Sequence, residues 1–183
     1  MDRLRVIRPL EADEVLSRSA EIAEIWPAAS RGRVSEILPC HAARAGFRFR
    51  AAEDDGLLIG FSYGYLGAEG QWWHDLVAAE LTDEQERRWL APGHFEFVEL
   101  HVRPGHRRQG WGGALHDEVL RGVEGRTSVL STQTDNEPAL ALYRGRDWQV
   151  VVPEMSFSPA GVPYSILGLE LVPSKIGTCS ASS

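Results

Sequence analysis

The clearest candidate for binding chemistry in this sequence is a basic, glycine-rich segment at residues 102–113. It follows an apolar run at residues 95–102 that predicts a strand, and it precedes a pattern typical of a helix up to about Val123. Glycines let a backbone approach a ligand closely, the first amides of a helix have no helical acceptor, and the helix dipole adds positive potential. The segment therefore predicts a turn that holds phosphate.

The glycine turn lacks both common nucleotide-binding fingerprints, the lysine-bearing phosphate loop and the three-glycine dinucleotide pattern with a later acidic residue. It carries instead the spacing Arg-x-x-Gly-x-Gly, at Arg107, Gly110 and Gly112. One predicted strand further along, residues 136–143 follow the spacing Asn-x-x-Ala-x-x-x-Tyr. With both motifs the chain resembles the GNAT superfamily of acyl-CoA-dependent N-acetyltransferases, well over residues 95 to about 157 and, before that, by the order of elements.

The chain departs from the family pattern at two positions. Asp147 stands where the family usually has a glycine before an aromatic residue, here Trp148. Aspartate tolerates the left-handed backbone conformation better than most residues, so the helix can still end there. Trp111, between the two glycines, is bulkier than the usual aliphatic residue, and we expect it to pack into the core rather than to narrow the cofactor groove.

The resemblance implies that the chain takes acetyl-CoA as a co-substrate and uses no metal. Arg107 and Arg108, with the main-chain amides that follow them, would hold the pyrophosphate, because a guanidinium matches phosphate oxygens. The residues implied in cofactor binding, through side chain or backbone, are Leu100, His101, Val102, Arg107, Arg108, Gly110, Trp111, Gly112, Gly113, Asn136 and Tyr143. Asn136, just before Glu137 and Pro138, is also an N-cap for the next helix.

Acetyl transfer to an amine needs a base, because a free amine is mostly protonated at neutral pH. Glu96 and Glu99 lie on the strand that should line the active site, and strand alternation predicts that they point to opposite faces. At most one of them then faces the acceptor. We favour Glu99, acting directly or through water, with His101 on the same face. A solvent-facing or ion-paired carboxylate is the structural alternative.

The resemblance also supplies a candidate acid and an oxyanion donor. Tyr143 would lie near the thioester sulfur, where its phenol can protonate the departing thiolate. A main-chain N–H of residues 100–102 would meet the thioester oxygen as it becomes negative. The alternative for Tyr143 is a core tyrosine on a helix face.

The elements that would position these residues alternate between strand and helix in the second half of the chain, which favours an α/β fold. As the resemblance implies, we expect a mixed, mostly antiparallel sheet with a parallel pair at the cofactor cleft, flanked by helices. The expected strands are residues 4–8, 47–53, 57–66, 95–102, 126–133, 148–157 and 164–171. The expected helices are residues 11–26, 34–44 with an interruption at Pro39, one that begins after Thr82, one up to about 123, and 136–144.

Residues 67–93 are long for a simple connection, and long connections often carry function. Trp72, Trp73, His74 and Asp75 are candidates for lining the acceptor pocket, because aromatic rings stack on an amine or sugar and a carboxylate pairs with a cation. Packing of both tryptophans in the core is the alternative.

Length and composition limit the class of protein. The 183 residues predict one domain over residues 1–172, followed by a disordered tail of small polar residues at 173–183. Cys40 and Cys179 form no CxxC pair, so neither a disulfide framework nor a zinc site is expected. An apolar run of about eighteen residues and a signal-peptide pattern are both missing, so we expect a cytoplasmic protein without a membrane partner.

The net charge of −7 argues against a general nucleic-acid partner, including one bound through Arg103, Arg107 and Arg108. The expected partner is instead a small-molecule or peptide amine. An inactive acyl-CoA-binding sensor or partner module is the alternative function, because the glycine turn by itself implies only binding. The resemblance also leaves open a homodimer that pairs through its sheets.

Overall fold

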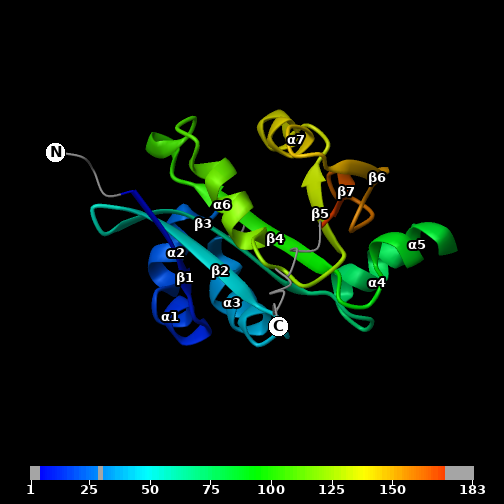
Figure 1. Cartoon of the computed structure of the whole chain (residues 1–183), viewed down its shortest axis with the longest axis horizontal. Coiled ribbons are helices and arrows are strands. Elements are labelled where there is room, and N and C mark those ends of the chain that lie inside the picture. Colours follow the sequence, from blue (N-terminus) through cyan, green and yellow to red (C-terminus); the bar gives the residue numbers. More distant parts are fainter. Residues whose placement is uncertain (1–4, 29–30, 172–183) are drawn as a thin grey trace, which may run out of the picture.

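The computed structural model describes residues 5–28 and 31–171. Its strands form one sheet in the order β1-β2-β3-β4-β5-β7-β6 (Figure 1). They are β1 (Arg5–Leu10), β2 (Arg48–Asp54), β3 (Leu57–Leu66), β4 (Phe95–Val102), β5 (Thr127–Gln133), β6 (Gln149–Met155) and β7 (Tyr164–Glu170). Neighbours are antiparallel except β4 and β5, which run parallel. The mixed sheet predicted from the sequence is confirmed, and the tail predicted at residues 173–183 lies outside the described residues.

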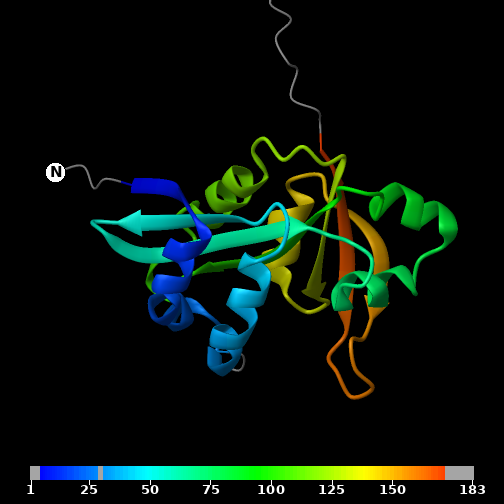
Figure 2. The ribbon, with the colours of Figure 1, turned by 90° about the horizontal axis from the view of Figure 1, so that it is seen from below.

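Helices cover both faces of this sheet. They are α1 (Ala12–Ser17), α2 (Ser19–Ile25), α3 (Val34–Ala42), α4 (Trp72–Ala78), α5 (Asp83–Trp89), α6 (Trp111–Leu120) and α7 (Glu137–Arg144), with short 3-10 turns at Arg31–Arg33 and Pro104–His106. Helices α1 to α3 pack on one face of β2 and β3, and α6 packs on the other (Figure 2). No helix in the described part of the chain has the length and apolar character that crossing a bilayer requires.

The hairpin predicted at residues 47–66 is confirmed. Its turn places Asp55 and Gly56 at φ angles of 50° and 82°, a left-handed pair that glycine and aspartate tolerate. β3 is buried on both faces, because Leu58 packs against the α1–α3 side and Ile59 against the α6 side. This hairpin therefore forms the rigid centre against which β4 is laid.

Two expected helices differ from the structure. The helix expected at residues 11–26 is broken at Arg18, whose backbone (φ −99°, ψ 13°) ends α1 and begins α2. The expected interruption at Pro39 is wrong, because α3 continues through it. A proline removes only one helical N–H, and here the apolar face of α3 stays anchored by buried Val34 and Leu38.

The connection at residues 67–93 holds two short helices. The helix expected after Thr82 is confirmed as α5, with a capping box in which the Gln85 amide donates to the Thr82 hydroxyl and the Thr82 amide to the Gln85 side chain. α4 was not predicted, because its residues Trp72–Ala78 have no side-chain cap to announce a start. Both helices pack on the sheet face opposite α7.

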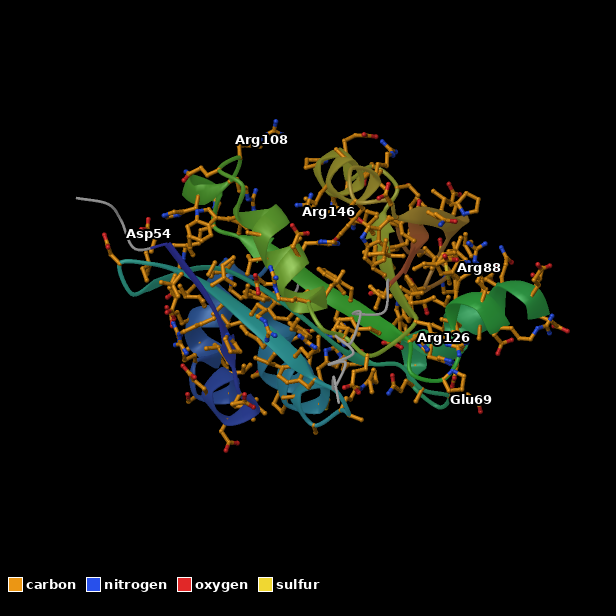
Figure 3. The ribbon with its side chains drawn as sticks, in the orientation of Figure 1. Asp54, Glu69, Arg88, Arg108, Arg126 and Arg146 are labelled. Carbon is orange, nitrogen blue, oxygen red and sulfur yellow. The ribbon has the colours of Figure 1, made fainter. Side chains whose placement is uncertain are left out.

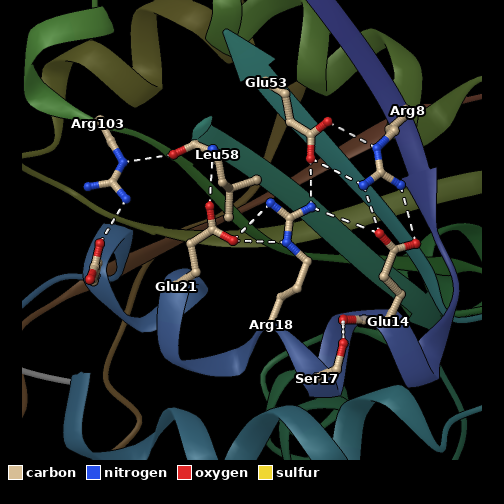
Figure 4. Close-up of polar contacts among 9 residues, drawn as sticks. Arg8, Glu14, Ser17, Arg18, Glu21, Glu53, Leu58 and Arg103 are labelled. Atoms are coloured by element: carbon tan, nitrogen blue, oxygen red, sulfur yellow. Dashed lines mark hydrogen bonds and ion pairs between the residues drawn. The ribbon is translucent and has the colours of Figure 1, made fainter. Parts of the chain in front are cut away.

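An ion-pair network fastens α1 and α2 to the edge of the sheet (Figure 4). Glu53 of β2 accepts from Arg8 Nε at 3.0 Å and from Arg18 Nη1 at 2.6 Å. Arg8 also bonds Glu14, and Arg18 bonds Glu21, so the break between α1 and α2 coincides with a clamp onto the strand. The clamp fixes the helices that form one wall of the cleft described below.

Glu53→Gln is expected to destabilise the fold by about 1 to 3 kcal/mol near neutral pH, because a half-buried carboxylate between two guanidinium groups is lost. Burial raises the pKa of Glu53, but the hydrogen bonds from Arg8 and Arg18 outweigh it and set the pKa below its ordinary value of 4.5. A carboxylate whose pKa is lowered in the folded state stabilises the fold at pH values above its pKa in the unfolded state. This stabilisation is lost as the pH falls through its pKa in the folded state.

Urea unfolding at about pH 7 and about pH 4 tests this effect. Wild type should lose more stability than Glu53→Gln between the two values. Glu170→Gln, which removes an exposed carboxylate paired with Arg88, is the control and should follow wild type. Equal acid sensitivity of Glu53→Gln and wild type would contradict the assignment.

Candidate active site

A cleft opens where β4 and β5 part. The two strands pair only at Phe95 with Ser128 and at Glu96 with Val129, and then separate. The cleft has a volume of about 770 Å³ and is lined by both strands, by α7, and by residues near α3, α4 and the β6–β7 loop. β4 carries a bulge at this level, since Tyr63 pairs with Glu99 while Gly64 already pairs with Phe97. A bulge bends a strand and increases its twist, which turns β4 away from β5.

The bulge corrects one prediction about the two carboxylates. Val98 is the extra residue, so the side-chain alternation restarts after it. Glu96 pairs with Tyr65 and Glu99 with Tyr63, and these tyrosines are two residues apart on one face of β3. Both glutamates therefore line the same cleft, although an unbulged strand would send them to opposite faces.

Glu99 forms a close pair with His101, as expected for residues on the same face. His101 Nε2 donates to Glu99 Oε2 at 2.6 Å. The His101 ring rests against Trp26 and Phe61, with centroids 5.8 and 5.4 Å away. The carboxylate is half-buried and reaches the cleft, so it can contact a ligand there.

Tyr143 reaches the cleft from the last turn of α7. Its ring packs edge-on against Phe97, with centroids 6.2 Å apart, and its side chain is almost fully buried. Burial first, and then the charge of Glu99, raise the pKa of the phenol well above its ordinary value. Tyr143 is therefore protonated at neutral pH and has a proton to give.

Asn136 fulfils the capping role predicted for it and also lines the cleft. Its side chain accepts from the Ala139 amide at 3.4 Å at the start of α7. The helix ends as predicted too, because Asp147 takes a left-handed φ of 61° just before Trp148 enters the core.

The glycine turn connects β4 to α6 and has the form predicted for a phosphate site. Gly110, at φ 86°, precedes the helix, and Ala114 donates the first helical hydrogen bond back to it. The amides of Gly112 and Gly113 thus lie in the first turn, before the helical bonding begins. Within the described residues, a Cβ built on Gly110 or Gly112 meets no atom within 4 Å. The space beside these two glycines is therefore free for a diphosphate, while Gly113 lies against the Arg146 side chain.

The two arginines of the turn differ in their contacts. Arg107 is exposed, and its Nε donates to the Val102 carbonyl at 2.9 Å, which braces the loop and leaves the other guanidinium nitrogens for a ligand. Arg108 stands at the outer tip of the loop with a left-handed φ of 62° (Figure 3). Trp111 is buried with Ile59 and Leu115, so its predicted core position is confirmed.

A third guanidinium, not anticipated from the sequence, crosses the first turn of α6. Arg146 lies between α6 and α7 (Figure 3), so close to Gly113 that any Cβ there would strike its Nη2 atom. Asp117 holds it by a 2.8 Å bond to Nε. In the sequence Arg146 is only a basic residue three positions before the strand β6, and this spacing does not indicate which helix it contacts.

Of the four candidates in the long connection, the two tryptophans line the cleft and the other two residues do not. Trp72 lines the cleft and is 63% exposed, and Trp73 lines it while its Nε1 donates to Ser131 Oγ at 3.1 Å. His74 and Asp75 do not line the cleft, contrary to expectation. The His74 side chain is buried behind it, and Asp75 bonds the Gly70 amide at the surface.

The wall formed by α2, α3 and β3 supplies residues that the sequence did not single out. Trp26, His41 and Tyr65 line the cleft there, and the Arg44 guanidinium lies 4.4 Å from the centre of the Tyr65 ring. Burial and then the charge of Arg44 lower the pKa of His41 to about 4, so this imidazole is neutral at neutral pH. The alternation Phe61-x-Tyr63-x-Tyr65 was the signal that could have identified Tyr65.

Comparisons with known proteins agree with this geometry. Residues 13–148 match the family model described as the acetyltransferase (GNAT) family. A GCN5-like protein acetyltransferase of Mycobacterium tuberculosis is 31% identical over 154 residues, which cover 80% of this chain and 75% of that protein.

Solved structures share the fold at low identity. One is a Salmonella typhimurium acetyltransferase determined with its cofactor acetyl-CoA, with a TM-score of 0.63, 14% identity, and coverage of 93% of this chain and 95% of that one. Another is an aminoglycoside 6′-acetyltransferase type Ii, with a TM-score of 0.64, 15% identity, and coverage of 92% and 99%. At these identities the likeness concerns the fold alone.

Proposed function

Because this chain belongs to the GNAT family of acetyltransferases, we propose that it transfers an acetyl group from acetyl-CoA to a primary amine by direct attack. One observation carries the proposal above all: Glu99 and Tyr143 line the same splayed β4–β5 cleft, and β4 leads directly into the glycine turn that opens α6. A binding module needs the glycine turn alone, whereas transfer also needs a proton acceptor and a proton donor in the same cleft.

The cofactor side uses main-chain groups more than side chains. The amides of Gly112 and Gly113, the helix dipole of α6, and the guanidinium of Arg107 hold the pyrophosphate. Beyond the last pair with β5, the backbone at residues 100–102 bonds the pantetheine arm as an added strand would. A Salmonella typhimurium acetyltransferase of the same fold was determined with its cofactor acetyl-CoA, which supports acetyl-CoA as the co-substrate proposed here.

The chemistry requires one proton to leave the amine and one to reach the sulfur. Glu99, oriented by His101, takes the proton of the acceptor ammonium directly or through water. A main-chain N–H of β4 stabilises the negative charge that develops on the thioester oxygen. Tyr143 gives its proton to the departing thiolate and takes a replacement from the nitrogen of the collapsing intermediate, so that of the two protons the nitrogen loses, one goes to Glu99 and one reaches the sulfur. Cys40 and Cys179 lie outside both motifs, so no covalent enzyme intermediate is required.

Tyr143→Phe is expected to lower kcat by about tenfold to a hundredfold and to change the KM for acetyl-CoA by less than about threefold. The ring keeps its packing on Phe97, and only the donated proton is lost. Steady-state thiol release at saturating amine measures both constants. An unchanged kcat would remove the acid role of Tyr143.

A panel of primary amines, covering polyamines, amino acids, aminoglycosides and peptide N-termini, tests the proposed function. Free CoA is followed by its thiol, and the product is identified by a mass increase of one acetyl group on the amine. Thiol release that depends on one class of amine supports transfer. Binding of acetyl-CoA without amine-dependent release for any class would instead favour the inactive sensor or partner module.

A further inference from the structure

Four titratable side chains form two pairs along β4 and the residue before it. Glu99 and His101 are the pair at the cleft. Glu96 and His94 form a second pair, with Oε1 and Nε2 3.8 Å apart, and these two residues are 3% and 1% exposed. Because the bulge at Val98 aligns Glu96 with Glu99, the buried pair adjoins the floor of the cleft, which Glu96 lines.

The buried pair lacks one proton. His94 Nδ1 lies 3.1 Å from the Ala91 carbonyl, which can only accept, so Nδ1 carries the hydrogen. In a neutral ring Nε2 is then a bare lone pair, and it faces a second lone pair on Glu96 Oε1. Neither atom has a hydrogen-bond partner among residues 5–28 and 31–171. Two buried acceptors facing each other are unfavourable, whereas one added proton turns the contact into a hydrogen-bonded ion pair.

The backbone at Gly67 closes the space around the pair. The Gly67 amide donates to the His94 carbonyl at 3.0 Å. A Cβ at this position would strike His94 Nε2 and approach Glu96 Oε1 to 2.7 Å. The chain thus brings its main chain against the two bare atoms without offering them a side-chain donor, so a proton must come from the cleft or from the groups behind it.

A second imidazole–carboxylate pair packs beside this one. The His74 ring lies beside the His94 ring, with centroids 5.4 Å apart. His74 Nδ1 is 3.1 Å from Asp75 Oδ1, and the Asp75 side chain is 55% exposed at the start of α4.

We propose that Glu96 and His94 store the proton that the acceptor amine loses. This role rests on the proposed acetyl transfer. The ammonium N–H bond breaks as an O–H bond forms on Glu99. The proton then leaves Glu99 for Glu96 and ends on Nε2 of His94, which leaves an imidazolium beside a carboxylate and restores the Glu99 anion. After the product leaves, the proton returns from His94 through Glu96 to the open cleft.

Other charged and titratable groups surround this path. Tyr65 stands opposite Glu96 on β3, and burial, followed by the charges of Glu96 and Glu99, raises the pKa of its phenol. His41 and Arg44 approach Tyr65 from α3 and the residues after it. Tyr65 pairs with Glu96 across β3 and β4 and lines the cleft with both carboxylates, so we assign its hydroxyl to carry the proton between them.

The substitution Glu96→Gln removes the carboxylate that accepts a proton but keeps the packing of the side chain. The amide has the size of the carboxylate, and its NH₂ can donate to His94 Nε2, so the contact is satisfied without a proton. We expect kcat to fall by about tenfold to a hundredfold, and to fall most at low pH, where wild type still turns over. The Kd for acetyl-CoA should be unchanged. His94→Asn, which keeps a donor for Ala91 and removes Nε2, should give the same pH profile.

Imidazole ¹⁵N spectra of the intact protein supply a readout independent of turnover. In wild type the His94 Nε2 signal should change from bare to protonated within the pH range of activity, and in Glu96→Gln it should stay bare. Asp54→Asn is the control. It removes the carboxylate of another carboxylate–imidazole pair, which lies 3.7 Å from His106 Nε2 and outside the cleft. Both kcat and the His94 signal should then match wild type.

The outcomes are distinct. If wild type acetylates amines but His94 keeps one neutral form over the whole active range, or if kcat and its pH profile survive Glu96→Gln, the storage role is wrong. If wild type releases no thiol with any amine, the proposed function fails instead, whatever His94 does.

Discussion

Glu99→Gln is expected to lower kcat by about 10² to 10⁴ at neutral pH, the usual range for removal of a general base, with acetyl-CoA affinity close to wild type. Glutamine keeps the length of the side chain and an oxygen that accepts from His101 Nε2, so the 2.6 Å contact and the ring packing on Trp26 can persist. The amide cannot take a proton from the ammonium. The loss should therefore fall on kcat and kcat/KM together.

The pH profile distinguishes loss of a base from general damage. As pH rises toward the pKa of the free amine, more of the acceptor arrives already neutral, so the Glu99→Gln rate should rise more steeply with pH than the wild-type rate. Glu170→Gln is the control, because it removes a carboxylate that pairs with Arg88 at the surface. If Glu99→Gln keeps the wild-type kcat and an unchanged pH profile, Glu99 is not the general base, and Glu96 is the remaining candidate carboxylate in the cleft.

The parts of this molecule that could be predicted from sequence are those fixed by local rules. The strand at residues 95–102 ends and the helix begins where alternation gives way to glycine. Asn136 caps α7, and Asp147 adopts the left-handed conformation, because each follows from the chemistry of one residue and its near neighbours. Trp111 packs against Ile59 and Leu115 in the core, as expected for a bulky residue at the start of this helix.

The error about Glu96 came from pairing between strands. Nothing within residues 95–102 marks Val98 as the extra residue, because a bulge is defined only by the partner strand that it faces. That one residue decides whether Glu96 shares the cleft with Glu99. Likewise, the buried neighbours of His94 come from Ala91, Gly67 and α4, which meet only after the long connection has folded back.

Gly110→Val is expected to abolish the stabilisation of the protein by acetyl-CoA. At a cofactor concentration about 100 times Kd, binding should stabilise wild type by about 2.7 kcal/mol and raise the Tm by about 5 to 10 °C. Gly110 precedes α6 at φ 86°, a conformation that a β-branched residue avoids at a cost of about 1 to 3 kcal/mol. The loop must change its path to relieve the strain, and the first-turn amides then no longer converge on the diphosphate.

Gly56→Val provides a closely matched control for this experiment. Gly56 has a φ of 82° in the β2–β3 turn, and within the described residues a Cβ there also meets nothing within 4 Å. Both variants should therefore lose similar stability without cofactor, but only Gly56→Val should keep the shift with acetyl-CoA. Arg107→Ala should reduce the shift without the backbone strain, because it removes a phosphate ligand and the brace on the Val102 carbonyl. A full shift in Gly110→Val, or none in wild type at millimolar acetyl-CoA, would mean that the cofactor is not held at the start of α6.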